Sequence, residues 1–168
     1  MPISGIEQPE IIEIEEGLRL RKYTDDCAFA LEWYQDEETL LLVDGVNAPY
    51  DKDRLYRMYH YLRDRGEVYF IEIMMEDKST YMPIGDVTFW QEDMPIVIGD
   101  PRFRGKGIGK KVVKALVDRA QKLGFSSVSV AEIYDYNIAS KKMFESVGFR
   151  AYEKTEKGSR YKMEMPVH

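Results

Sequence analysis

The segment from Arg104 to Lys110, Arg-Gly-Lys-Gly-Ile-Gly-Lys, has three glycines within five positions. Glycine leaves the backbone N–H groups around it unshielded by side chains. An apolar stripe with helical spacing begins directly afterwards, and the first turn of a helix has unpaired N–H donors and a partial positive charge. Together these features predict an anion-binding loop suited to a phosphate or pyrophosphate.

Two other phosphate-binding patterns fail on spacing. A P-loop that starts at Gly99 would need its second glycine at position 104, but that glycine is Gly105. A dinucleotide fingerprint that starts at Gly105 would need its third glycine at Lys110, and it should follow the first strand of a βαβ unit. Taken by itself, the segment could also be a glycine-rich turn without a ligand.

Periodicity predicts the elements on either side of this loop. A short strand, Pro95 to Gly99, precedes it, and the helix that follows ends at Gly124. Ser127 to Ile133 alternates like a strand, and Asn137 can cap a further helix that runs to Val147. The apolar stripe of the first helix consists of Val112, Val113, Leu116, Val117, Ala120 and Leu123.

The remaining pattern mixes hairpins with helices. We expect a loose arm over residues 1–16, and Thr24 or Asp25 should cap a helix that runs to Tyr34. Leu40 to Asn47 has no clear pattern. The other expected elements are a strand at 18–23, a helix at 51–65, a hairpin of 68–75 with 82–90, and a final hairpin of 150–153 with 161–165. This order predicts one domain, 1–168, of mixed α/β class, with a mostly antiparallel central sheet and about four flanking helices.

The motifs resemble those of the GNAT family of N-acetyltransferases. Arg104 to Gly109 matches the family pattern Arg/Gln-x-x-Gly-x-Gly/Ala at all three defined places. Asn137, followed by Ser140, Phe144 and Gly148-Phe149, is similar to a second family motif, a helix that begins at Asn and ends in Gly-Phe. The resemblance extends from Leu18 to Met165, nearly the whole chain.

The resemblance implies acetyl-CoA as cosubstrate and no metal. The strand residues Ile96, Val97 and Ile98 would pair their backbone with the pantetheine arm, Asn137 would contact the arm near its thiol end, and Lys142 would reach the 3′-phosphate or be a solvated surface lysine. The pyrophosphate would lie on the backbone amides of Arg104, Gly105, Lys106, Gly107, Ile108, Gly109 and Lys110.

Direct attack of an amine on the thioester, through a tetrahedral intermediate, needs a neutral amine and therefore a base. The family's base is usually a carboxylate near the start of the strand before the loop, a place that Asp93 and Glu92 match, although they could equally form a polar turn. Asp86 is a third candidate. The amide near Val97 could stabilise the oxyanion.

Many relatives protonate the thiolate with a tyrosine seven residues after the helix-initial asparagine. Here that residue is Phe144, which has no proton to donate. Tyr134 and Tyr136 are nearby alternatives, unless they only pack or lie on the surface. The departure leaves the general acid open.

The charge favours a cationic partner over a polyanion. The chain has 24 basic and 30 acidic residues, a formal charge of −6, which disfavours nucleic acid and suits a small cationic amine.

One cysteine, Cys27, excludes an internal disulfide and a multi-thiolate zinc site. No apolar run is long enough to span a membrane, and the N-terminus lacks a signal-peptide pattern, so we expect a cytoplasmic monomer or homodimer.

Two rival functions fit the same residues. A GNAT-like sensor could bind acyl-CoA without transferring the acyl group, and Phe144 is consistent with such a loss of chemistry. A nucleotide-binding protein could use the same anion loop. The acceptor itself has no recognisable pattern, so polyamines, aminoglycosides, amino acids and protein N-termini all remain open.

Overall fold

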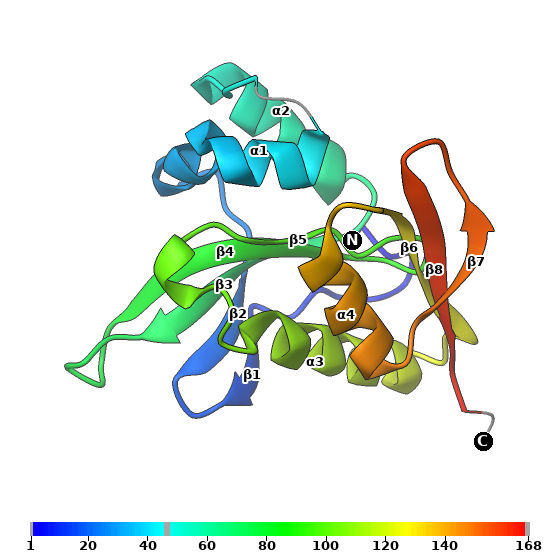
Figure 1. The fold of residues 1–168 in the computed structure, drawn as a ribbon. Coiled ribbons are helices and arrows are strands. Elements are labelled where there is room, and N and C mark those ends of the chain that lie inside the picture. Colours follow the sequence, from blue (N-terminus) through cyan, green and yellow to red (C-terminus); the bar gives the residue numbers. More distant parts are fainter. Residues whose placement is uncertain (1, 46–47, 167–168) are drawn as a thin grey trace. The chain divides into compact units, whose positions relative to one another are not determined.

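The computed structural model describes residues 2–45 and 48–166 (Figure 1). In chain order the elements are β1 (Ile11–Glu15), β2 (Leu18–Lys22), the 3₁₀ helix η1 (Ala28–Gln35), α1 (Glu37–Asp44), α2 (Lys52–Arg63), β3 (Glu67–Met74), β4 (Tyr81–Phe89), β5 (Ile96–Ile98), the 3₁₀ helix η2 (Pro101–Phe103), α3 (Ile108–Lys122), β6 (Ser127–Tyr134), α4 (Ile138–Val147), β7 (Arg150–Lys154) and β8 (Gly158–Glu164). They divide into two compact units. The N-terminal unit is Met1–Thr88 with Ile96–Arg104, and the C-terminal unit is Phe89–Pro95 with Gly105–His168.

A five-stranded sheet in the order β1-β2-β3-β4-β5 forms the frame of the N-terminal unit. The expected loose arm is wrong for Ile11–Glu15, which is strand β1 and pairs antiparallel with β2, with Ile11 opposite Arg21. β1 is an edge strand with no buried residue, so the sequence pattern does not mark it as part of a core. Backbone pairing with β2, rather than apolar burial, stabilises it.

Helices η1, α1 and α2 cover one face of this sheet (Figure 1). Asp51 caps α2 by accepting a hydrogen bond from the Arg54 amide. The helix predicted to begin at Thr24 or Asp25 begins only after Cys27, without a side-chain cap, and is 3₁₀. The unassigned stretch from Leu40 lies in α1, which Asp36 caps, apart from residues 46 and 47, which are outside the described residues.

The face under these helices is an aromatic core. Val68 and Phe70 of β3 pack there with the buried thiol of Cys27 and with aromatic rings from the helices. Each of six aromatic rings packs against at least one other ring of the set. These rings belong to Tyr23, Phe29, Tyr34, Tyr50, Tyr59 and Phe70. Such rings stabilise a core by apolar burial, but each tyrosine hydroxyl must find a polar partner.

The C-terminal unit contains α3, α4 and a three-stranded antiparallel sheet in the order β6-β8-β7. The predicted stripe of α3 is confirmed: Val112, Val113, Leu116, Val117 and Ala120 are all buried. Gly148 follows α4 with a positive φ of 125°, as expected for a helix end. The predicted α/β class with mostly antiparallel strands is confirmed, although the strands form two sheets rather than one central sheet.

Candidate functional site

The glycine-rich loop has the backbone that an anion site needs. Gly105 and Gly107 adopt left-handed φ angles of 70° and 79°, which glycine tolerates best. A Cβ built on either residue meets no atom within 4 Å, so the backbone is open to close approach. Gly107 is the N-cap of α3 and, having no side chain, provides no side-chain cap for the amides of the first turn. A phosphate could therefore contact this backbone directly.

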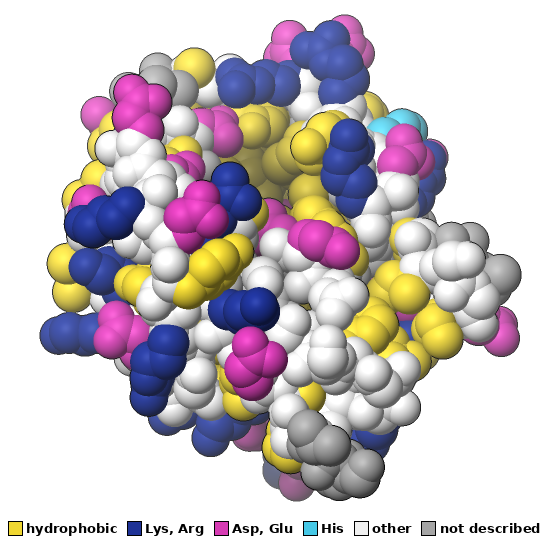
Figure 2. Space-filling view, turned by 90° about the vertical axis from the view of Figure 1, so that its right-hand side faces the viewer, with side chains coloured by type: hydrophobic (Ala, Val, Ile, Leu, Met, Phe, Trp, Pro, Cys, Tyr) yellow, Lys and Arg dark blue, Asp and Glu magenta, His cyan; other side chains and the backbone are white. Residues whose placement is uncertain are grey.

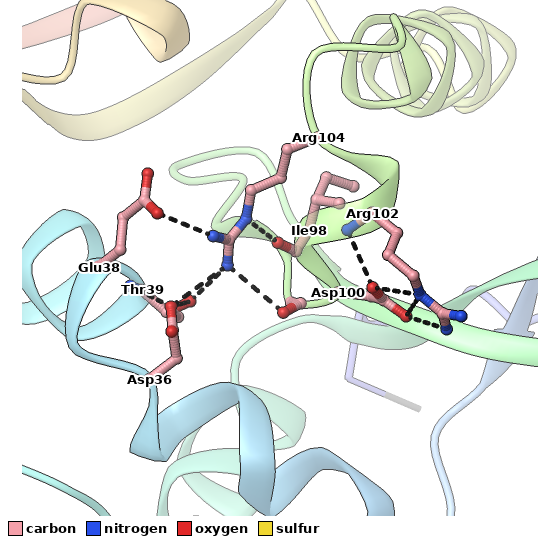
Figure 3. A network of polar contacts seen from close by, with 8 residues as sticks. Asp36, Glu38, Thr39, Ile98, Asp100, Arg102 and Arg104 are labelled. Atoms are coloured by element: carbon pink, nitrogen blue, oxygen red, sulfur yellow. Dashed lines mark hydrogen bonds and ion pairs between the residues drawn. The ribbon is translucent and has the colours of Figure 1, made fainter.

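Arg104 differs from the rest of the predicted loop. Its amide donates to the Pro101 carbonyl at 3.3 Å and closes the 3₁₀ turn η2. Its guanidinium contacts Ile98, Thr39 and Glu38, which belong to the N-terminal unit as Arg104 does (Figure 3). The loop's accessible donors therefore begin at Gly105, and its side-chain charge comes from Lys106, Lys110 and Lys111.

Strand β5 is an edge of the five-stranded sheet, as an extended ligand would require. It pairs with β4 through Val87 opposite Ile96, Asp86 opposite Val97, and Gly85 opposite Ile98. A Cβ on Gly85 would lie 2.1 Å from the Val97 carbonyl oxygen, so only glycine allows this approach. The Ile98 carbonyl already accepts Arg104 Nε at 2.9 Å.

Asp86 lies buried beneath the helices of the N-terminal unit. Its Oδ2 accepts hydrogen bonds from the hydroxyls of Tyr34, at 2.6 Å, and Tyr59, at 2.8 Å. Burial raises the Asp86 pKa to about 6, although both hydrogen bonds act in the opposite direction. Burial and the Asp86 charge raise the pKa of both tyrosines well above 10. The arrangement is a carboxylate that titrates near neutral pH, held by two proton-bearing phenols.

Asp93 and Glu92 lie in the turn between β4 and β5. Asp93 Oδ1 accepts the amides of Met94 and Ala131, both at 2.9 Å, so this carboxylate ties the turn to β6. Burial raises the Asp93 pKa, and the two amides counteract that effect. Glu92 is exposed. The expected polar turn is therefore present, and the Oδ1 atom of Asp93 is already engaged in hydrogen bonds that stabilise this turn.

The N-terminal end of α4 gathers the second set of predicted residues. Asn137 caps the helix through its Oδ1, which accepts the Ser140 amide at 3.2 Å. The rings of Tyr134 and Tyr136 stack with centroids 5.4 Å apart. Phe144 is buried and packs edge-to-face on Phe149. Lys142 is exposed on α4.

Several acidic side chains of the N-terminal unit already have partners. Asp25 accepts Tyr23 Oη and pairs with His60, and Asp36 and Glu38 pair with Arg104. On the face in Figure 2, acidic and basic side chains are interspersed, and no broad basic patch is visible there. Within residues 2–45 and 48–166, no group of three or more His, Cys, Asp or Glu side chains could hold a metal ion, and no helix is long and apolar enough to cross a membrane.

Sequence reasoning missed the partners of two residues. Tyr34 and Tyr59 are the contacts that tune Asp86, and they lie 52 and 27 positions from it. No short motif links such distant residues. The partners of Arg104 on α1, Thr39 and Glu38, lie 65 and 66 positions away, and no short motif links them to Arg104 either.

The comparisons with known proteins agree with this description. A family model described as an acetyltransferase (GNAT) domain matches residues 17–150. The chain belongs to the GNAT acetyltransferase family. No curated protein matches its sequence.

Solved structures share this GNAT fold at low sequence identity. A domain from Methanocaldococcus jannaschii is 21% identical and has a TM-score of 0.80, covering 90% of this chain and 100% of that one. The aminoglycoside acetyltransferase AAC(6')-Ib in complex with coenzyme A is 17% identical, with a TM-score of 0.69 and coverage of 88% and 94%. RimL, a ribosomal L7/L12 α-N-protein acetyltransferase in complex with coenzyme A, is 16% identical, with a TM-score of 0.71 and coverage of 93% and 98%.

Proposed function

We propose that this GNAT protein transfers the acetyl group of acetyl-CoA to a primary amine of a small molecule or peptide. The observation that carries the proposal is the open backbone of Gly105 and Gly107 before the uncapped first turn of α3. That geometry suits a pyrophosphate, and the family match makes coenzyme A its natural source.

The residues present fit acetyl-CoA. We assign the amides from Gly105 to Lys110 to the pyrophosphate and the free edge of β5 to the pantetheine arm. We assign Asn137 to the end of the arm that carries the thiol, and Lys142 to the 3′-phosphate. The bound cosubstrate supplies an acetyl group already activated as a thioester.

The protein's own task is then to deprotonate the amine. A lysine-like ammonium has a pKa of about 10.4 and carries no free electron pair at neutral pH. Asp86 is suited to accept its proton, since burial holds the Asp86 pKa at about 6 and the carboxylate is ionised at pH 7. Tyr34, which donates to that carboxylate, could relay the proton.

Asp93 and Glu92 stay as alternative bases. Asp93 shares the raised pKa, but two backbone amides already use its Oδ1. Glu92 is exposed. Asparagine and glutamine variants of the three carboxylates separate these assignments.

Tyr134 and Tyr136 are the candidates to protonate the leaving thiolate. The Tyr136 pKa is raised, chiefly by burial, so this phenol keeps its proton at neutral pH. Their stacked rings lie one and three residues before Asn137. Single phenylalanine variants test each hydroxyl while keeping the ring.

The charge of the chain and two structural neighbours bear on the class of acceptor amine. The net charge of −6 favours a cationic amine. One structural neighbour is an aminoglycoside acetyltransferase and another an α-N-protein acetyltransferase, so both small and peptide amines belong in the test.

A CoA-release assay with an amine panel tests the proposal. The panel contains a polyamine, an aminoglycoside, free amino acids and a short peptide with a free N-terminus. We expect release of CoA and a mass increase of one acetyl group on at least one amine. Binding of acetyl-CoA without transfer to any amine would instead support the sensor function.

A further inference from the structure

Arg104, the first residue of the glycine-rich motif, makes its side-chain contacts away from the loop (Figure 3). Its Nε donates to the Ile98 carbonyl at 2.9 Å, and one terminal nitrogen donates to the Gly99 carbonyl at 3.3 Å. That same nitrogen donates to Thr39 Oγ1 at 2.6 Å, and the other donates to Glu38 Oε2 at 3.3 Å. One side chain thus connects the end of β5 to the first turn of α1.

The contacts form a connected polar chain. Thr39 Oγ1 accepts from Arg104 and donates to Asp36 Oδ2 at 2.9 Å. Asp36 is the N-cap of α1, and its Oδ2 also accepts the Thr39 amide. Hydrogen bonds from the Thr39 amide and hydroxyl, followed by the charge of Arg104, lower the Asp36 pKa, so the cap stays ionised. The guanidinium therefore acts on the group that begins α1.

These contacts leave the guanidinium little capacity for a phosphate. Hydrogen bonds occupy four of its five N–H donors, and its side chain is only 23% exposed. Arginine's planar fork can hold several acceptors at fixed angles, whereas a lysine ammonium acts as a point charge.

We propose that Arg104 is a positioning residue whose guanidinium holds the first turn of α1 against the end of β5. The proposal rests on the proposed function, in which β5 pairs with the pantetheine arm, and it adds that the helices η1, α1 and α2 carry the acceptor side. The residue that opens the cosubstrate loop thereby fixes the helix on which acceptor binding depends.

The first experiment needs no acetyl transfer. Hydrogen exchange of the α1 amides is measured in the wild-type protein, Arg104→Lys and Thr39→Val. We expect exchange in α1 to rise about tenfold in both variants, the effect of losing one charge-assisted hydrogen bond, with α3 unchanged. The double variant should exchange no faster than Arg104→Lys, because both changes break the same link. Unchanged exchange in α1 would overturn the proposal.

The second experiment separates positioning from phosphate binding. Lys106→Gln is the matched control, since it removes a charge from the same motif and lies in the C-terminal unit rather than in the unit that contains α1. We expect Arg104→Lys to keep the Kd for acetyl-CoA within about threefold of wild type, while Lys106→Gln weakens it about tenfold. If Arg104→Lys weakens acetyl-CoA binding as much as Lys106→Gln does, the guanidinium is a cosubstrate ligand and the proposal is wrong.

Steady-state kinetics test whether the loss of α1 positioning affects acceptor binding rather than acetyl-CoA binding. With the panel amine that releases CoA fastest, Arg104→Lys should raise KM for the amine about tenfold and leave KM for acetyl-CoA nearly unchanged. A rise in KM for acetyl-CoA alone would contradict the positioning role. If no amine is acetylated, the proposed function fails, whereas the exchange and binding measurements still decide whether Arg104 positions α1.

Discussion

At the scale of single residues, Asp86 is unusual because it is a carboxylate in an environment that disfavours its ionised form. The carboxylate is buried, and its two hydrogen-bond donors are neutral phenols rather than cations. A buried carboxylate with a pKa near 6 typically reflects a functional need, since a neutral side chain would pack at lower cost. Activity and stability should therefore respond in opposite directions when Asp86 is changed.

Asp86→Asn tests the activity. We expect the rate with a working amine to fall roughly a hundredfold or more, the usual share of one acid–base group. In the wild-type protein the rate should rise with pH through about 6, as Asp86 loses its proton. The variant should lack this limb of the pH–rate profile. Asp93→Asn is the matched comparison, and if it removes the limb while Asp86→Asn keeps it, the base is Asp93.

The same variant should stabilise the fold at neutral pH. Well below pH 3.8, the ordinary pKa of this carboxyl, Asp86 is largely protonated in both the folded and unfolded states. Between about pH 4 and 6 the folded protein keeps a proton that the unfolded chain has lost, so stability falls as pH rises. A pKa difference of about two pH units corresponds to about 3 kcal/mol at pH 7. Denaturant unfolding of wild type and Asp86→Asn at pH 4 and 7 measures this effect, and a variant less stable than wild type at pH 7 would contradict it.

Phe144 is a packing residue at the place where relatives often carry an acid. Its ring is 2% exposed and lies against Phe149 with centroids 5.2 Å apart. We expect Phe144→Leu to cost about 1 kcal/mol of stability and to change the acetylation rate less than threefold, with an unchanged pH profile. Tyr134→Phe is the comparison in the same assay. A large rate loss in Phe144→Leu at unchanged stability would give the ring a role in catalysis.

At the scale of elements, the loop before α3 depends on backbone angles rather than on side chains. Gly107 and Gly124 lie beyond the two ends of α3, with φ angles of 79° and 83°, and an added Cβ meets no atom within 4 Å at either position. The two glycines thus form a matched pair: they share the conformational constraint, but only Gly107 belongs to the predicted anion site.

We therefore compare Gly107→Ala with Gly124→Ala. Both should lose about 1 to 2 kcal/mol of stability, because an L-residue in the left-handed region is strained. Only Gly107→Ala should weaken acetyl-CoA binding, by about tenfold or more, since its methyl group would lie where the backbone meets the pyrophosphate. Isothermal titration with acetyl-CoA measures this difference. Equal affinities in the two variants would remove Gly107 from the binding site.

At the scale of the whole molecule, ligand binding should appear as thermal stability. A ligand at 100 times its Kd that binds only the folded state contributes about 2.7 kcal/mol. For a chain of this length, such a gain raises Tm by about 5 to 10 °C. We expect this rise with acetyl-CoA and CoA, but not with ATP or NAD at the same concentration. A rise with NAD or ATP alone would favour the nucleotide-binding alternative.

The sequence alone determined the features that depend on local backbone geometry and periodicity. Glycine spacing marked the loop at Gly105 and Gly107, the apolar stripe marked α3, and Asn137 marked the start of α4. These features are readable because neighbours in sequence are also neighbours in space, so residue type and spacing express the structure directly. The family motifs were found for the same reason.

Only the tertiary structure decided which side chains meet across the chain. Strand β1 has no buried residue and was visible only through its pairing with β2. Tyr34 and Tyr59 converge on Asp86, and Arg104 reaches Glu38 and Thr39, because the fold packs η1, α1 and α2 on one face of the sheet. Burial and hydrogen bonding set the Asp86 pKa and the direction of the Arg104 side chain. Both depend on residues far away in the sequence, so no local pattern could have encoded them.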